Sequence, residues 1–60
     1  MMANIPKDPV MLLSYINTQL RDFYPSLNEC CLSLGIEEEE IMKSLASIDY
    51  RYDNEKNQFM

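Results

Sequence analysis

The chain has 60 residues, 47% of them hydrophobic, with one Gly and three Pro, a composition typical of one small globular domain and not of a disordered or repetitive chain. Ten acidic residues against five scattered basic ones give a formal net charge of −5, so the sequence lacks the basic surface of an ordinary nucleic-acid-binding protein. The absence of His, of a glycine-rich phosphate loop and of a nucleophile beside an obvious base leaves no residue that we assign to catalysis, to a cofactor or to a metal.

The first predicted helix spans residues 9–24. Asp8 suits the N-cap, Pro9 suits the first helical position, and Pro25 ends the helix because the residue before a proline is pushed out of helical conformation. Apolar residues then recur at the three-to-four spacing of one helical face. The predicted buried face consists of Leu13, Ile16, Leu20 and Tyr24, flanked by Leu12 and Phe23.

Four residues of this helix are candidates for an interaction surface. At about 100° per residue, Asn17 falls beside the buried face, next to Val10 and Arg21, while Met11 and Tyr15 project from the far side. For Asn17 a half-buried amide with satisfied hydrogen bonds is favoured over a ligand contact. Met11 and Tyr15 are either isolated exposed side chains or part of an interface, and the small core favours an interface.

The second predicted helix spans residues 26–34. Ser26 and Glu29 have the spacing of a capping box, in which each side chain accepts a hydrogen bond from the other residue's backbone N–H. Gly35 can close the helix in the left-handed conformation. The predicted buried face consists of Leu27, Cys30, Cys31 and Leu34.

The two cysteines are neighbours in sequence and cannot easily bridge each other. We expect Cys30 and Cys31 to be buried, reduced thiols that act as small apolar side chains, with a redox or interchain role as the alternative.

A third helix is predicted over residues 37–48, with Ile41, Leu45 and Ile48 buried and Met42 at the edge of the buried face. Within residues 50–60, aromatic and charged residues alternate before a turn-rich segment, so these residues are predicted to form a β-hairpin. Residues 3–5 are a candidate third short strand.

The second and third helices have the spacing of a helix-turn-helix, because a small residue, Cys31, is followed by Gly35 at the bend and by apolar anchors one turn apart. The first helix and the hairpin complete the outline. The sequence therefore predicts a mainly α, three-helix domain that resembles a degenerate winged helix.

The run of glutamates argues against DNA binding by this scaffold. A glutamate about 8 Å from a phosphate is repelled by about 0.5 kcal/mol even at the dielectric of water. Anionic residues in the first turn of a helix are favoured by its dipole, and Glu40 can back-bond the cap, so starting the helix is the favoured role; an acidic surface for a basic partner is the alternative. The positions that would face a DNA groove are Glu37, Glu38, Glu39, Met42, Lys43 and Ala46.

The segments IPKDP, INTQLRD and NQF, within a stretch from Ile5 to Phe59, resemble the short bacterial proteins catalogued as domain of unknown function 4250. The resemblance implies a free-standing bacterial cytosolic domain of undetermined role. It assigns no functional residue.

Two features bear on the cellular location. The longest apolar run, Val10 to Leu13, is far shorter than the roughly 20 residues of a membrane span, and the N-terminal segment MMANIPKDP lacks the regions of a signal peptide. We therefore expect a cytoplasmic protein with no membrane partner.

The favoured function is a non-catalytic module that binds a protein partner or itself. The alternative is a transcription-related protein that binds DNA through Arg51 and Lys56 with Lys7 or Arg21, or that mimics nucleic acid with its acidic third helix. An enzyme or metal carrier built on carboxylates is disfavoured. The candidate interaction surface comprises Met11, Tyr15, Asn17, Arg21, Glu37, Glu38, Glu39 and Lys43.

Overall fold

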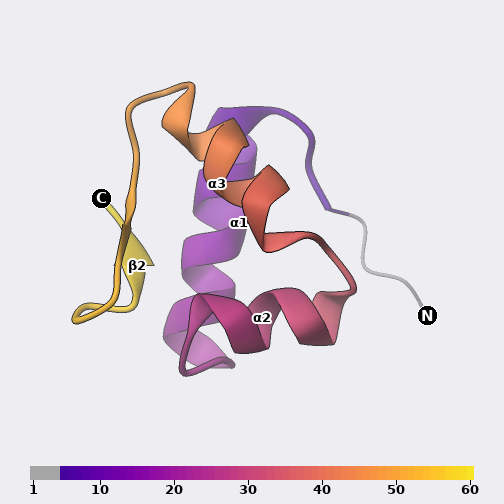
Figure 1. The fold of residues 1–60 in the computed structure, drawn as a ribbon, viewed down its shortest axis with the longest axis vertical. Coiled ribbons are helices and arrows are strands. Elements are labelled where there is room, and N and C mark those ends of the chain that lie inside the picture. Colours follow the sequence, from indigo (N-terminus) through magenta and orange to yellow (C-terminus); the bar gives the residue numbers. More distant parts are fainter. Residues whose placement is uncertain (1–4) are drawn as a thin grey trace.

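The computed structural model describes residues 5–60, which form three helices and a two-stranded antiparallel hairpin (Figure 1). α1 stands upright at the back of the view, α2 lies across its lower end, α3 lies in front of its upper half, and the hairpin flanks the helices (Figure 1). The predicted three-helix domain with a C-terminal hairpin is confirmed. The elements are α1 (Pro9–Asp22), α2 (Leu27–Leu34), α3 (Glu38–Ala46), β1 (Tyr52–Asp53) and β2 (Gln58–Phe59).

The caps of α1 follow the sequence. The Asp8 Oδ2 atom accepts a hydrogen bond from the Met11 N–H at 3.1 Å, and Pro9 occupies the first turn. At the other end, the N–H groups of Phe23 and Tyr24 both donate to the Gln19 carbonyl, which closes the helix before the proline.

Both ends of α2 also form as predicted, except for half of the capping box. The Ser26 hydroxyl oxygen accepts from the Glu29 N–H at 3.2 Å, but no reciprocal bond from Ser26 N–H to the Glu29 carboxylate is present within residues 5–60. Gly35 adopts φ 70°, the left-handed conformation, and the Ile36 N–H donates to the Cys31 carbonyl. That glycine turns the chain towards α3.

The start of α3 differs from the expectation. Glu37 is the N-cap, but its side chain makes no capping hydrogen bond, and no bond links Glu37 N–H to the Glu40 carboxylate in the described part of the chain. Glu38, Glu39 and Glu40 occupy the first turn, as predicted. Their favourable interaction with the helix dipole therefore acts without a side-chain cap.

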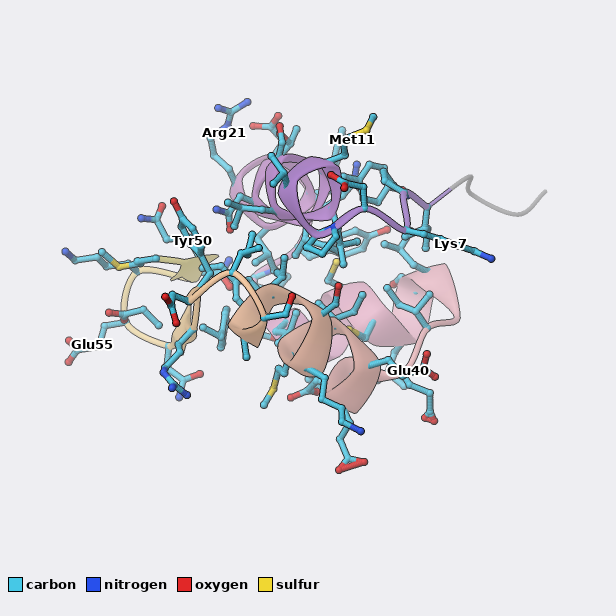
Figure 2. All side chains as sticks on the ribbon, turned by 90° about the horizontal axis from the view of Figure 1, so that it is seen from above. Lys7, Met11, Arg21, Glu40, Tyr50 and Glu55 are labelled. Atoms are coloured by element: carbon cyan, nitrogen blue, oxygen red, sulfur yellow. The ribbon has the colours of Figure 1, made fainter. Side chains whose placement is uncertain are left out.

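The core lies where the three helices and β2 meet. The buried residues are Leu12, Ile16, Leu20, Leu27, Cys30, Cys31, Ile41, Leu45 and Phe59. Figure 2 shows side chains filling the layer between α1 and the α2–α3 pair.

Three predictions about the exposure of α1 side chains were wrong. Leu12 is buried, whereas Leu13 is half-buried, so the buried face is rotated from the predicted one. Phe23 is 68% exposed, because the backbone leaves the helix at this residue (φ −127°) and its side chain no longer follows the face. Tyr15 is half-buried and packs against the core instead of projecting from the far side.

The hairpin pairs Tyr52 with Phe59 and Asp53 with Gln58. Arg51 and Met60 also exchange two backbone hydrogen bonds, of 3.1 and 2.9 Å, which add one pair to the ladder. The candidate strand at residues 3–5 falls mostly outside the described residues, and Ile5, which is described, is not in a strand.

The turn of the hairpin is held by its own side chains. Asp53 Oδ1 accepts from the N–H groups of Glu55 and Lys56, at 2.9 and 3.1 Å. Asn57 then takes φ 52°, a left-handed conformation that Asn tolerates better than most residues. These two residues set the direction in which β2 returns.

Candidate functional site

An open groove of about 870 Å³ lies between α3, the start of α2 and the hairpin. Its apolar lining comes from Leu27, Met42, Ala46, Tyr50, Tyr52 and Phe59. Its charged lining comes from Glu38, Glu39, Glu40, Lys43 and Arg51. The groove therefore combines an apolar floor with a rim of both signs, the composition common at protein-binding surfaces.

Helical spacing explains the α3 side of the groove. Glu39, Met42, Lys43 and Ala46 are three or four residues apart, so they follow one side of α3. The core anchors Ile41 and Leu45 lie on the opposite side.

A backbone contact joins the segment that leads into the hairpin to α3. The N–H of Tyr50 donates to the carbonyl of Leu45 at 3.0 Å, which places Tyr50 beside the last turn of α3. Arg51 follows directly. A residue from the hairpin therefore contributes positive charge near the C-terminal end of α3.

The charges of the groove form no ion pair with each other. Within residues 5–60, the salt bridge joins Arg21 and Asp22, on α1. Among the groove carboxylates, Glu38 Oε1 accepts one side-chain bond, from Asn28 Nδ2 at 3.4 Å. The remaining charges are available to an external partner.

The predicted interaction residues divide among separate places. Glu38, Glu39 and Lys43 line the groove, whereas Glu37 lies in a second hollow that Lys7 also lines. Figure 2 shows two further candidates, Met11 and Arg21, on the outer side of α1, away from the α2–α3 pair. Met11 is 62% exposed.

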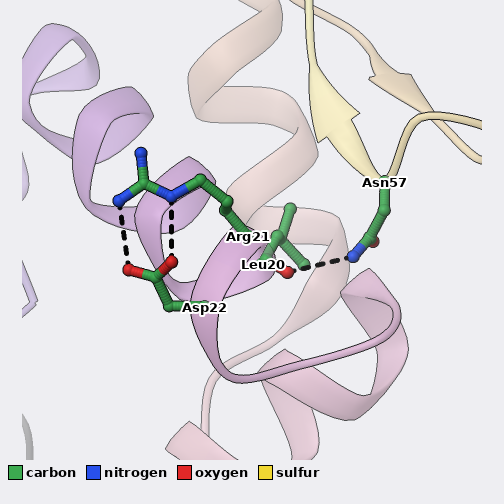
Figure 3. Close-up of polar contacts among 4 residues, drawn as sticks. All are labelled: Leu20, Arg21, Asp22 and Asn57. Atoms are coloured by element: carbon green, nitrogen blue, oxygen red, sulfur yellow. Dashed lines mark hydrogen bonds and ion pairs between the residues drawn. The ribbon is translucent and has the colours of Figure 1, made fainter.

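Arg21 is engaged with its neighbour on that outer side (Figure 3). Its guanidinium donates from Nε to Asp22 Oδ1 at 2.9 Å and from Nη2 to Oδ2 at 3.1 Å. This contact lowers the pKa of Asp22 and raises that of Arg21. Both groups are exposed to water, so the pair contributes little to stability.

Asn17 holds the hairpin to α1. Its Nδ2 donates to the Phe59 carbonyl at 3.1 Å, and its Oδ1 accepts from the Phe59 N–H at 2.8 Å. Because Arg51 and Met60 exchange both ladder bonds, the next pair, Tyr52 and Phe59, directs its N–H and C=O groups outwards. The amide of Asn17 thus satisfies the outer edge of β2, and this contact gives it a structural role.

A second network joins the hairpin to both α1 and α2. Asn57 Nδ2 donates to the carbonyls of Leu20, at 3.1 Å, and Tyr24, at 2.9 Å; Figure 3 shows the Leu20 contact. The Tyr52 hydroxyl donates to Asn57 Oδ1 at 2.6 Å and accepts from the Leu27 N–H at 3.2 Å. No spacing along the chain predicted this network; the available signal was the tyrosine that begins a strand and the asparagine in the NQF segment.

The thiols are buried and unbridged, as predicted. Burial raises the pKa of Cys31 to about 11, with smaller contributions from Cys30 and Glu38, and burial also raises the pKa of Cys30. A protonated thiol is a poor nucleophile and a poor metal ligand. Among the described residues, no three His, Cys, Asp or Glu side chains converge as a metal site, and no helix could cross a membrane.

The sequence model of one protein family, described as "Domain of unknown function (DUF4250)", matches residues 6–59. The chain belongs to this family. No curated protein and no solved structure matches the chain. The likeness to a winged helix therefore stays a prediction, while membership of the DUF4250 family, which the sequence segments indicated, is confirmed.

Proposed function

We propose that this member of the DUF4250 family is a cytoplasmic, non-catalytic protein-interaction module whose docking surface is the groove between α3 and the hairpin. The observation that carries the proposal is the composition of this groove: exposed Met42 and half-buried Tyr50 and Tyr52 lie within a rim of charges that have no ion-pair partner among residues 5–60. Such a surface gains both apolar burial and charge pairing when another protein covers it.

The groove has little of what an enzyme site needs. Its lining includes no histidine and no thiol, and the carboxylates of α3 lie on its rim, next to water. The two thiols of the chain, Cys30 and Cys31, are in the core with raised pKa values. These features favour binding over chemistry.

A crosslinked pull-down with three versions of the full chain tests this proposal. Met42→Glu puts a charge on the groove floor, and Met11→Glu makes the same change at an exposed methionine on the outer side of α1. We expect the wild type and Met11→Glu to recover the same partner and Met42→Glu to lose it. Recovery by all three, or by none, would contradict the proposal, provided that thermal unfolding shows both variants folded.

The second candidate function, DNA binding, receives support from Lys43 and Arg51, which line the groove where a recognition helix and a wing would meet DNA. Glu38 and Glu39 line the same groove and repel phosphate. We therefore expect no binding of duplex DNA at a salt concentration of about 50 mM, where non-specific binding is strong. Fluorescence anisotropy with a labelled duplex measures this, and an affinity that falls steeply with added salt would favour DNA binding instead.

A further inference from the structure

The charges along α3 are ordered from one end of the groove to the other. Glu38 and Glu39 are in the first turn, Met42 is in the middle, and Lys43 follows. Arg51 adds a second positive charge near the last turn, because its neighbour Tyr50 bonds to Leu45. The groove is therefore negative at the N-terminal end of α3 and positive towards its C-terminal end.

This order is complementary to itself. If two copies of α3 lie antiparallel across a two-fold axis, Glu39 of each copy faces Lys43 of the other. At 1.5 Å of rise per residue, the axis midway between these residues passes about 1.5 Å from the level of Met42. The two Met42 side chains then lie about 3 Å apart along the helix direction and meet at the axis.

We infer that the occupant of the groove is a second copy of this chain, docked with its α3 antiparallel to the first, so that two Glu39–Lys43 pairs flank a central contact between the Met42 side chains. The inference rests on the proposed function, since it names the partner of the same groove. The choice of partner follows from charge complementarity. The two-fold axis reverses the order of the charges, so the groove of one copy presents positive charge where the groove of the other presents negative charge.

The side chains on this side of α3 suit such a contact. Met42 is 43% exposed and has a flexible thioether that adapts to an irregular partner surface. Ala46 is small, which allows another helix to approach closely. A chain of 60 residues has a small core, so apolar burial between copies adds stability that the single chain lacks.

Charge reversal tests the inference by sedimentation equilibrium over a concentration series. We expect the wild type to dimerise. Glu39→Lys creates two Lys–Lys contacts and Lys43→Glu creates two Glu–Glu contacts, so each variant alone should dimerise about tenfold more weakly or worse. An equal mixture of the two variants restores both opposite-charge pairs, so we expect the mixture to form a heterodimer near wild-type affinity.

Two control variants make the same charge changes away from the groove. Glu55→Lys and Lys56→Glu are in the exposed turn of the hairpin and should leave dimerisation unchanged. A wild type that stays monomeric at every concentration overturns the inference, as does a dimer that the α3 variants do not weaken or a mixture that does not recover.

Failure of this inference is distinguishable from failure of the proposed function. A monomeric wild type that still recovers another protein, which Met42→Glu loses and Met11→Glu keeps, refutes the second copy as occupant and leaves the docking groove in place. A monomeric wild type that recovers nothing refutes both.

Discussion

At the scale of single residues, Asn17 and Asn57 fasten the hairpin to the helices. Asn17 uses its donor and its acceptor on the backbone of Phe59, whereas Asn57 donates to two backbone carbonyls and accepts from the Tyr52 hydroxyl. A short hairpin is marginal alone, since two strands bury little apolar surface. Its position in this domain therefore depends on a few side chains of α1 and of the turn.

Asn17→Ala tests the first of these contacts. The substitution leaves the N–H and C=O of Phe59 without their partner, so we expect the free energy of unfolding to fall by about 2 kcal/mol. Urea unfolding followed by circular dichroism measures the change. Thr18→Ala, at the adjacent exposed position, is the control, and equal losses for the two variants would contradict the structural role of Asn17.

Tyr52→Phe tests the second network. The variant keeps the ring that lies 5.5 Å from Phe59 but removes the hydroxyl that joins Leu27 to Asn57. We expect a loss of about 1–2 kcal/mol in the free energy of unfolding, because the Leu27 N–H loses its acceptor. The matched control is Tyr50→Phe, since the Tyr50 hydroxyl makes no hydrogen bond within residues 5–60; an equally destabilised control would argue against the network.

The sequence predicts part of this residue-scale structure. Helical spacing placed Asn17 beside the buried face and favoured a satisfied amide, which the structure confirms. Spacing along one helix carries no information on the partner, because Phe59 is 42 residues away in sequence. The bonds of Tyr52 and Asn57 were missed for the same reason.

At the scale of elements, the start of α3 lacks a side-chain cap, so a substitution there can stabilise the helix. Glu37 has the extended backbone of an N-cap (φ −81°, ψ 125°) but makes no side-chain capping bond. We predict that Glu37→Ser raises the free energy of unfolding by about 1 kcal/mol, because Ser accepts a bond from an exposed N–H of the first turn. In a domain of this size the expected increase in Tm is about 4–8 °C.

Differential scanning calorimetry measures this gain. Glu55→Ser removes the same charge at an exposed position outside any helix, so it separates the new cap from the lower net charge. A rise in Tm of the same size in both variants would assign the effect to charge alone.

Helix ends were predictable because their signals are local: Asp8 and Pro9, Ser26, and Gly35 each act within one turn. The exposure of Phe23 was not predictable, because it depends on how the chain leaves α1 to reach α2.

At the scale of the whole molecule, the buried thiols make stability depend on pH. The pKa of Cys31 rises from an ordinary value of 9.0 to about 11 in the folded chain. A raised thiol pKa means that folding favours the neutral form of the thiol. The contribution of the thiol to the free energy of unfolding is therefore full below pH 9 and is lost as the pH rises towards 11. We therefore expect the free energy of unfolding to decrease across this range.

Urea unfolding at several pH values checks the prediction. Because Tyr and Lys also titrate near pH 10, the comparison is with a variant that combines Cys30→Ala and Cys31→Ala. The variant should lose less stability than the wild type between pH 8.5 and about 10.5, given the raised thiol pKa. Parallel curves for the two proteins would show that the thiols do not contribute.

The order of elements was predictable at this scale, because the change from helical to alternating spacing after Asp49 marks the hairpin. The groove was predictable on one side only. Helical spacing brought Glu38, Glu39 and Lys43 to one face, whereas the hairpin side depends on contacts between residues far apart in sequence, such as that of Asn17 with Phe59.

The amide of Asn17 has a consequence for aggregation. A fibril grows when each chain offers two free strand edges, one for the neighbour above and one for the neighbour below. In this hairpin Asn17 occupies the outer edge of β2, so within the described part of the chain β1 is the strand that keeps a free edge, at Tyr52. A second chain can pair with that edge, but a stack of strands cannot continue through the folded domain. The side chain of Asn17 therefore opposes the growth of a fibril from folded chains.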